Sequence, residues 1–324
     1  MNFEFRKPSK EARIAISNAY KDYEDEDYIK KAENKIKSKT NHKNVKLVNS
    51  GNSAILVCLN SINSPILIPD QGGWHGFKQI AKFLGKGVIE IKTNKGVINT
   101  EKIDKAIKNL NEDDCPKGAI LLTSFAGYTA EQPIKEISKF ANENNLILIE
   151  DASGGILDNE KKLGNGKYSD IIVSSTGSPK IINLGYGGFI STNNQGLLEK
   201  SNLLIKTLSL NNQIAKGLIH EIDSGEKFFK IAVKTCEYLK KNLENVIHKD
   251  ERGINVILST DNPKKIAIEL KKEFKIDKSS FITRCPNYNR VKEKGIAIEI
   301  KNLSPKSLNK ENLDYIVETV SKLM

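Results

Sequence analysis

Long apolar runs are missing from this chain of 324 residues. No segment approaches the roughly 20 apolar residues that a membrane-spanning helix needs, so the sequence predicts no membrane span. The first fifteen residues, MNFEFRKPSKEARIA, carry charges and lack the apolar core of a secretory signal. We therefore expect a cytoplasmic protein that has no membrane partner.

Cysteine is scarce, and the four residues of this type lie far apart in the sequence, at Cys58, Cys115, Cys236 and Cys285. No two of them form a CxxC pair, so we expect neither a zinc site nor a thioredoxin-like motif. Isolated thiols of this kind are most simply interpreted as buried core residues. Cys285 differs from the others because it lies between Arg284 and Pro286, in a predicted loop.

Arginine is also rare, although the net charge is +11 and the pI about 9.2. The only arginines are Arg6, Arg13, Arg252, Arg284 and Arg290. Proteins that read bases and phosphates specifically favour the arginine fork. The lysines are spread along the chain beside Glu and Asn. A solvated lysine-rich surface is thus favoured over a nucleic-acid interface.

Predicted strands and helices alternate over residues 46–192. The strands are nearly continuous apolar runs at 46–51, 64–70, 87–93, 118–125, 146–153, 168–176 and 187–192. The helices between them are predicted at 52–62, 77–85, 100–110 and 134–145. This alternation predicts a three-layer α/β fold with a mostly parallel sheet covered on both faces. Ligands of such sheets lie beyond the carboxyl ends of the strands.

Both ends of the chain have a different pattern. Residues 9–39 show helical spacing of apolar positions, so 1–45 is predicted as an N-terminal helical segment. Residues 196–246 are also helical. They are followed by short strands at 254–260, 281–283 and 295–300 and by helices at 263–273 and 310–323. We expect a large domain at 46–205 and a small C-terminal α+β domain at 206–324.

Polar features lie where several predicted strands end. Ser50-Gly51-Asn52-Ser53 forms a strand-to-helix turn, and backbone N–H groups at a helix N-terminus bind phosphate well. Asp151 ends the apolar strand LILIED. A buried carboxylate there needs a partner, which could be a protonated pyridine nitrogen, a helix terminus or an ion pair.

Two further features follow neighbouring strands. Trp74-His75 places a flat side chain where it could cover one face of a planar ligand, or serve as an ordinary surface aromatic. Lys180 follows the hydroxyl-rich run SSTGSP and precedes the glycine-rich segment LGYGG. Hydroxyl groups can donate to a phosphate, and a lysine near a cationic ring can have the lowered pKa that imine chemistry needs. Taken alone, Lys180 could equally be solvent-exposed.

Together, in this order, these features resemble the fold-type I enzymes that depend on pyridoxal 5'-phosphate (PLP), the aspartate aminotransferase superfamily. The likeness extends over about residues 45–195. It lies in NSGNSAI, ILIPDQGGWHGFKQIAKFLG, LILIEDASGG and SSTGSPKIINLGYGGFIST. Within the superfamily, the chain looks most like the DegT-type aminotransferases and the group of selenocysteine synthases and Sep-tRNA:Cys-tRNA synthases. The resemblance also implies a homodimer with the site at its interface.

The resemblance implies catalytic roles for two residues. Lys180 would form a Schiff base with PLP and move the α-proton, and Asp151 would pair with the pyridine nitrogen. Lys180 follows Asp151 by 29 residues. Ser175 matches a phosphate-binding serine, with Ser178 as an alternative donor.

Other matched residues would surround the cofactor. Gly51, Asn52 and Ser53 match the cup that holds the phosphate. Trp74 matches the residue that stacks on the ring, and His75, one position later, could replace it.

Two positions depart from the family pattern. Gly154 stands three residues after the aspartate, where the family often has Gln, His or Tyr, so Ser153 or water is expected to do part of that work. The last strand, GIAIEIKNLSP, lacks the arginine that often binds a substrate carboxylate. Arg284 or Arg290 could form the bidentate clamp instead. Otherwise the substrate lacks a free α-carboxylate, as in an amino sugar or an amino acid esterified to tRNA.

These observations predict a PLP-dependent transferase acting on a small amine or amino acid, most simply an aminotransferase. A second hypothesis is a PLP enzyme acting on a tRNA-linked amino acid. The basic surface would then bind the phosphates of the tRNA, and Cys285 could carry sulfur as a persulfide. A third is a non-catalytic binding or regulatory protein that retains the fold. Gly154 favours this third hypothesis, whereas the intact pair of Lys180 and Asp151 opposes it.

Overall fold

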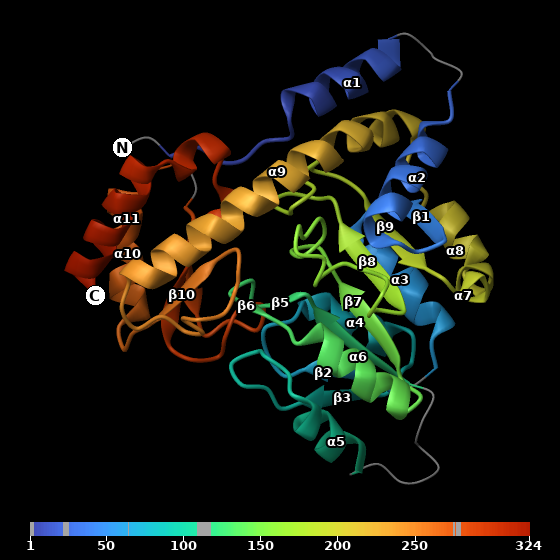
Figure 1. Cartoon of the computed structure of the whole chain (residues 1–324), viewed down its shortest axis with the longest axis horizontal. Helices are drawn as coiled ribbons and strands as arrows, with labels where there is room; N and C mark the ends of the chain where they lie inside the picture. Colours follow the sequence, from blue (N-terminus) through green and yellow to red (C-terminus); the bar gives the residue numbers. More distant parts are fainter. Residues whose placement is uncertain (1–2, 22–25, 64, 109–117, 275, 277–279) are drawn as a thin grey trace.

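A computed structural model describes residues 3–21, 26–63, 65–108, 118–274, 276 and 280–324 (Figure 1). The N-terminal segment forms two helices, α1 (Lys10–Lys21) and α2 (Tyr28–Thr40), where the sequence predicts one helical stretch. α2 begins at its N-cap Asp27, which accepts a hydrogen bond from Lys30 N, and it ends at Asn41 in the left-handed conformation. α1 packs against α9 (Asn212–Asn242), and α2 packs against α9 and β1 (Asn44–Val48).

Seven strands form the main sheet in the order β1-β9-β8-β7-β4-β2-β3. The strands not yet introduced are β2 (Ile66–Pro69), β3 (Val88–Ile91), β4 (Ala119–Thr123), β7 (Ile147–Asp151), β8 (Ile171–Ser175) and β9 (Gly188–Thr192). The neighbours from β3 to β8 run parallel, whereas β9 pairs antiparallel with both β8 and β1. β7 is the central strand, so its carboxyl end opens at the middle of the sheet.

Side chains alternate between the two faces of this sheet, and each face has its own core. One core includes Leu67, Leu122 and Leu148 and reaches α2, α5 (Thr100–Lys108), α6 (Ile134–Glu143) and α9. The other includes Ile68, Leu121 and Ile149. It is covered by α3 (Gly51–Ser61), α4 (His75–Phe83), α7 (Gln195–Lys200) and α8 (Asn202–Thr207). Strands buried on both faces explain the continuous apolar runs, and the predicted three-layer α/β fold is confirmed.

The C-terminal part forms a smaller α+β unit. Its sheet has the order β10-β12-β11 and is antiparallel, with β10 (Val256–Ser259), β11 (Ile282–Cys285) and β12 (Gly295–Ile298). α10 (Pro263–Glu273), α11 (Lys310–Leu323) and two short 3-10 helices, η2 (Ile300–Asn302) and η3 (Pro305–Leu308), complete it. A small hairpin of β5 (Phe125–Ala126) and β6 (Ala130–Glu131) follows β4.

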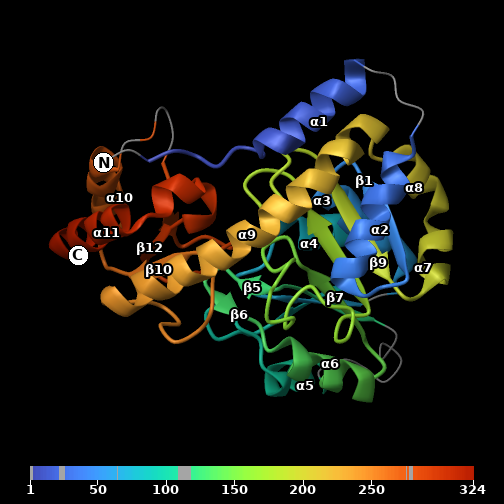
Figure 2. The ribbon, with the colours of Figure 1, turned by 45° about the horizontal axis from the view of Figure 1, so that its top comes forward.

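The long helix α9 joins the two parts. Figures 1 and 2 both show α1 beside one of its ends and the small sheet with α10 and α11 at the other. Residue 205 lies in α8, just before α9 begins. The division into 1–45, 46–205 and 206–324 stays a prediction.

The cysteines lie largely where the sequence suggests. Cys58, Cys236 and Cys285 are buried free thiols, and Cys115 lies outside the described residues. Cys285 was expected in a loop, but it ends β11 because its backbone pairs with Gly295 of β12. Among the described residues, no helix is long and apolar enough to cross a membrane.

Candidate active site

A cavity of about 240 Å³ opens where β7 and β8 end. Its walls bring together most of the site residues predicted from the sequence. They come from the start of α3, the loop before α4, and the two segments that follow β7 and β8. The lining residues are Ser50, Gly51, Asn52, Ile55, Trp74, Asp151, Ser153, Val173, Ser174, Ser175, Ser178 and Lys180.

The turn at the start of α3 forms one wall. Ser50 is the N-cap, and its Oγ accepts a hydrogen bond from Ser53 N at 3.1 Å. Ser53 is not a wall residue, because its hydroxyl turns back to Asn49 Oδ1 at 2.5 Å. A Cβ on Gly51 would lie 2.6 Å from the Ser175 Cβ, so only glycine lets the turn approach β8 this closely. The helix N-terminus therefore lies beside the Ser175 hydroxyl.

A chain of hydrogen bonds fixes Asp151 at the end of β7. The backbone N and Oγ of Ser153 both donate to Asp151 Oδ1, at 3.0 and 2.5 Å. The Ser153 hydroxyl in turn accepts from Ser175 N at 2.8 Å, and Ser175 Oγ accepts from Gly177 N at 3.1 Å. Burial raises the pKa of Asp151, while Lys180 and Ser153 act to lower it. Ser153 is thus the residue that links the aspartate to the hydroxyl-rich strand end.

Lys180 lies across the cavity from these groups, with its amine between two aromatic rings. Its Nζ donates to the Tyr128 hydroxyl at 2.5 Å and lies 5.9 Å from the centre of the Trp74 ring. Burial acts to lower the Lys180 pKa, but electrostatic interactions with Tyr128 and Asp151 outweigh it, so the pKa is raised. The sequence suggested a lowered pKa. The direction differs because these two partners favour the charged amine.

The backbone of the lysine segment is held by Arg6, which comes from the N-terminal segment. Its guanidinium donates to Lys180 O and Ile181 O, each at 2.7 Å, and lies 3.7 Å from the centre of the Phe228 ring. Burial lowers the Arg6 pKa to about 10, although Glu221 acts to raise it. Sequence patterns gave no sign of this contact, because the partners are 174 and 175 residues apart.

The two candidate stacking residues point to different places. Trp74 lines the cavity, and its Nε1 donates to Asn52 Oδ1 at 2.9 Å. His75 is the first residue of α4 and turns away. Its ring stacks on Tyr288, with centroids 4.9 Å apart. His75 therefore lines a neighbouring cavity instead of this one.

Tyr128 is another site residue that the sequence reasoning missed. It lies in the turn between β5 and β6 with a φ of +63°, which is uncommon for a residue other than glycine. A Cβ on Gly154 would lie 3.0 Å from two carbons of its ring. The room that a longer residue at position 154 would need is therefore taken by Tyr128. The feature of the sequence that could have pointed to Tyr128 is its position soon after β4, the strand beside β7.

Neither arginine expected to clamp a carboxylate lines the cavity. Arg290 Nε and Nη2 each donate to the Glu299 carboxylate at 2.8 Å, so its fork is already occupied. Arg284 is exposed on β11, where its neighbours in the strand point inward. Cys285 is also unsuited to carrying sulfur, because it is 1% exposed and burial raises the pKa of its thiol.

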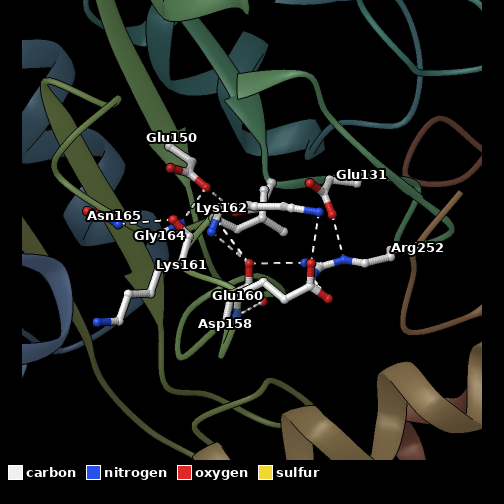
Figure 3. Close-up of polar contacts among 11 residues, drawn as sticks. Glu131, Glu150, Asp158, Glu160, Lys161, Lys162, Gly164, Asn165 and Arg252 are labelled. Atoms are coloured by element: carbon white, nitrogen blue, oxygen red, sulfur yellow. Dashed lines mark hydrogen bonds and ion pairs between the residues drawn. The ribbon is translucent and has the colours of Figure 1, made fainter. Parts of the chain in front are cut away.

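Behind β7, a second polar network anchors the strand that ends in Asp151 (Figure 3). Glu150 is fully buried and accepts from Ser124 Oγ, Gly164 N and Ser169 Oγ at 2.6, 2.8 and 2.6 Å. Nearby, Arg252 of the small unit pairs with Asp158, Glu131 and Glu160. These contacts hold the 158–169 loop against the back of the site. No cluster of three or more His, Cys, Asp or Glu side chains in the described part of the chain could bind a metal ion.

Comparison with known proteins gives the class of this fold and site. The model of the DegT/DnrJ/EryC1/StrS aminotransferase family matches residues 10–231, so the chain belongs to this family. The resemblance inferred from the sequence is thereby confirmed. The model of the MJ1341 family C-terminal domain matches residues 226–321.

Individual relatives match this chain either over part of its length or at low sequence identity. A UDP-4-amino-4,6-dideoxy-N-acetyl-beta-L-altrosamine transaminase of Campylobacter jejuni (strain 81-176) is 33% identical over 117 residues, which span 36% of this chain and 29% of the relative. Among solved structures, Helicobacter pylori PseC, an aminotransferase of pseudoaminic acid biosynthesis, has a TM-score of 0.76 at 16% identity, covering 100% of this chain and 99% of PseC. The SepCysS–SepCysE N-terminal domain complex gives 0.75 at 18%, covering 99% and 95%.

Proposed function

We propose that the protein is a PLP-dependent aminotransferase in which Lys180 carries the cofactor and Asp151 binds the pyridine nitrogen. The observation that carries this proposal is the hydrogen-bonded series Asp151–Ser153–Ser175 facing Lys180 across one cavity. Membership of an aminotransferase family supports it independently.

The donor set of the cavity fits each part of PLP. The start of α3 at Gly51 and Asn52, together with the hydroxyls of Ser175 and Ser178, suits a phosphate. The Trp74 indole suits the face of a ring. Asp151 suits a protonated nitrogen, because a buried carboxylate gains from a cationic N–H partner. Ser53 would act indirectly by stabilising the turn, and His75 is excluded from the proposed set by its orientation.

Bound PLP supplies an aldehyde that condenses with amines, releasing water, and a ring that delocalises negative charge. The protein's own residues provide the rest. Lys180 Nζ holds the cofactor and then moves a proton at the substrate carbon that bears nitrogen. Asp151 keeps the ring nitrogen protonated, and Trp74 shields one face of the ring from water. Arg6 keeps the Lys180 backbone fixed while its side chain moves.

For the substrate, we propose an amine without a free α-carboxylate, such as an amino sugar. The support is that Arg290 is fully paired with Glu299 and Arg284 is exposed, which leaves neither of them to bind a carboxylate in the cavity. The name of the Campylobacter relative, a sugar transaminase, agrees with this class. A tRNA-linked amino acid also lacks a free carboxylate, but the buried Cys285 gives that hypothesis no support.

We also propose a cytoplasmic homodimer. The support is the likeness to the fold-type I PLP enzymes, which implies a homodimer with the site at its interface. Light scattering after size exclusion tests it. A mass of one chain at micromolar concentration would contradict the homodimer.

The test of the cofactor assignment is spectroscopic. Purified protein reconstituted with PLP is expected to show an imine absorbance band that borohydride removes, and mass mapping should place the reduced adduct on Lys180. Lys180→Ala should lose both band and adduct. Lys200→Ala, which removes an exposed lysine at the end of α7, is the matched control and should keep both. An adduct on another lysine, or a band that persists in Lys180→Ala, would refute the proposal.

The reaction is tested with amino donors and acceptors. An aminotransferase converts its cofactor to the aminated form with a donor alone and returns it with an acceptor. Amino sugars linked to nucleotides and free amino acids are compared as donors. Conversion only by donors that have a free carboxylate would contradict the proposed substrate class, and salt-sensitive binding of tRNA would revive the second hypothesis.

A further inference from the structure

Tyr128 is held in an unusual backbone conformation whose effect is to bring its hydroxyl to the active lysine. The residue has a φ of +63°, and its OH lies 2.5 Å from Lys180 Nζ. Non-glycine residues adopt this conformation at some cost and do so where the surroundings fix them. The neighbouring Gly127 also has no room for a side chain, because its Cβ would lie 2.9 Å from Arg290 O. The turn is therefore pressed closely against the small unit.

The ring of Tyr128 lies against the space that a side chain at position 154 would occupy. A Cβ on Gly154 would approach two ring carbons at 3.0 Å and Ile254 at 3.4 Å. A Cβ at this distance would force the tyrosine ring to shift, and a longer side chain would compete with the ring for the same space. We therefore call Gly154 and Tyr128 a matched pair, because the absence of a side chain at position 154 leaves room for the tyrosine ring.

Residues of the small unit surround the rest of the ring. Arg290 and Lys301 lie 4.8 and 5.0 Å from its centre, a distance at which a cation is attracted by an aromatic face. Both cations pair with the buried Glu299, at 2.8 and 3.0 Å. We call these three residues the small-unit ion cluster. The Tyr128 carbonyl also accepts from the backbone N of Ile254 and Asn255, at 2.9 and 3.0 Å.

We propose that Tyr128 is the positioning residue of Lys180, taking the place left by Gly154, and that the small-unit ion cluster holds it there. This inference rests on the proposed function, in which Lys180 is the reacting amine. The hydroxyl gives the amine a fixed partner in addition to the nearby Asp151, and the small unit, by holding the ring, completes a site built mainly from the large sheet. The charged or titratable groups that face Lys180 are Asp151 of β7, Tyr128 and Arg290, with Lys301 behind the ring.

The first test measures the titration of Lys180 itself, by the pH dependence of its reductive methylation with formaldehyde in the full chain, mapped by mass spectrometry. Tyr128→Phe removes only the hydroxyl, so the midpoint for Lys180 should fall by about one pH unit, as expected for loss of a charge-assisted hydrogen bond. Lys301→Met breaks the small-unit ion cluster, so loss of the Tyr128 contact should move the midpoint downward, whereas loss of the like charge alone would move it upward. Tyr20→Phe, at an exposed tyrosine of α1, should change nothing.

An unchanged midpoint in Tyr128→Phe would overturn the positioning role, and an unchanged or raised midpoint in Lys301→Met would overturn the role of the ion cluster. In this assay the Lys180 amine reacts with formaldehyde and no PLP is added, so the result does not depend on PLP binding. Failure of the wild-type chain to form a PLP adduct would instead refute the proposed function.

The second test exchanges the matched pair. Gly154→Gln should weaken PLP binding at least tenfold, because the new side chain collides with the Tyr128 ring. Tyr128→Ala should also weaken it, and should shift the Lys180 midpoint downward. Combining the two changes should recover most of the binding, since the glutamine then occupies the space that the ring has left. Gly154→Gln that binds PLP as well as wild type, or a double variant no better than either single variant, would overturn the inference.

Discussion

Glu150 gives the sharpest test of how the strand that ends in Asp151 is anchored. Its carboxylate is completely buried on the opposite side of β7 from the cavity and accepts three hydrogen bonds (Figure 3). Glu150→Ala leaves the Gly164 N–H and the hydroxyls of Ser124 and Ser169 without their partner. Each buried donor left without a partner costs about 1–3 kcal/mol, so the loss of this acceptor for three donors should cost about 3 kcal/mol or more.

Glu150→Gln should behave differently, because it keeps the geometry and removes the charge. Its amide oxygen can accept from Ser124 and Gly164, which both donate to one carboxylate oxygen, and its NH2 group can donate to the Ser169 hydroxyl. The buried charge carries a desolvation cost, and burial raises the Glu150 pKa despite the hydrogen bonds. We expect the free energy of unfolding of Glu150→Gln to lie within about 1 kcal/mol of wild type at pH 7.

The pH dependence follows from the same shift. A carboxyl group whose folded pKa is raised stabilises the fold below its unfolded pKa and loses that contribution as the pH rises through the folded pKa. Glu150→Gln lacks this group. Its stability relative to wild type should therefore increase from pH 4 to pH 7. Urea unfolding followed by circular dichroism measures both variants, with the slope m checked for constancy.

The reasoning fails if Glu150→Gln is destabilised as much as Glu150→Ala, since the negative charge itself would then be required. It also fails if Glu150→Ala costs less than about 1 kcal/mol, which would mean that the network relaxes or is hydrated.

Three further predictions concern other parts of the site. The charges of its two cationic partners hold the Glu299 pKa well below its usual range despite burial, so its stabilisation should be lost as the pH falls below about 4.5, and acid titration of Glu299→Gln should lack that loss. Gly51→Ala should weaken PLP binding at least tenfold by pushing α3 from β8, whereas Gly196→Ala, at an exposed position of α7, should bind PLP like wild type in a fluorescence titration. Arg6→Met frees two carbonyls of the lysine segment, so hydrogen exchange there should accelerate and PLP affinity should fall.

The sheet could be predicted from the sequence because strands buried on both faces leave a clear signal. Each apolar run of 46–192 became a strand of the main sheet, and the topology then dictated the site. β7 and β8 are parallel neighbours, so Asp151 and the segment after Ser175 meet at the same edge. The pairing of Asp151 with Lys180 in one cavity is therefore a consequence of the strand order that the structure shows.

The side-chain choices that failed or stayed open depend on contacts across long separations. The sequence alone could not exclude Arg290 as the residue that binds a substrate carboxylate. Its pairing with Glu299, which follows β12, is visible only in the structure. Trp74 and His75 differ by one residue, and only the start of α4 at His75 decides which of them turns into the cavity. Arg6 lies too far away in sequence for any local pattern to link it with Lys180.

Gly154 shows how an apparent loss in the sequence can be an exchange in the structure. If Gly154 is interpreted as a missing cofactor contact, it favours the hypothesis of a non-catalytic protein. The Tyr128 ring, however, lies against position 154 and brings a hydroxyl to Lys180. A glycine is then the residue that this arrangement requires, because any Cβ at 154 presses on the ring. Gly154 therefore gives no support to the non-catalytic hypothesis. The compensating residue is Tyr128, which comparison of position 154 alone would not identify.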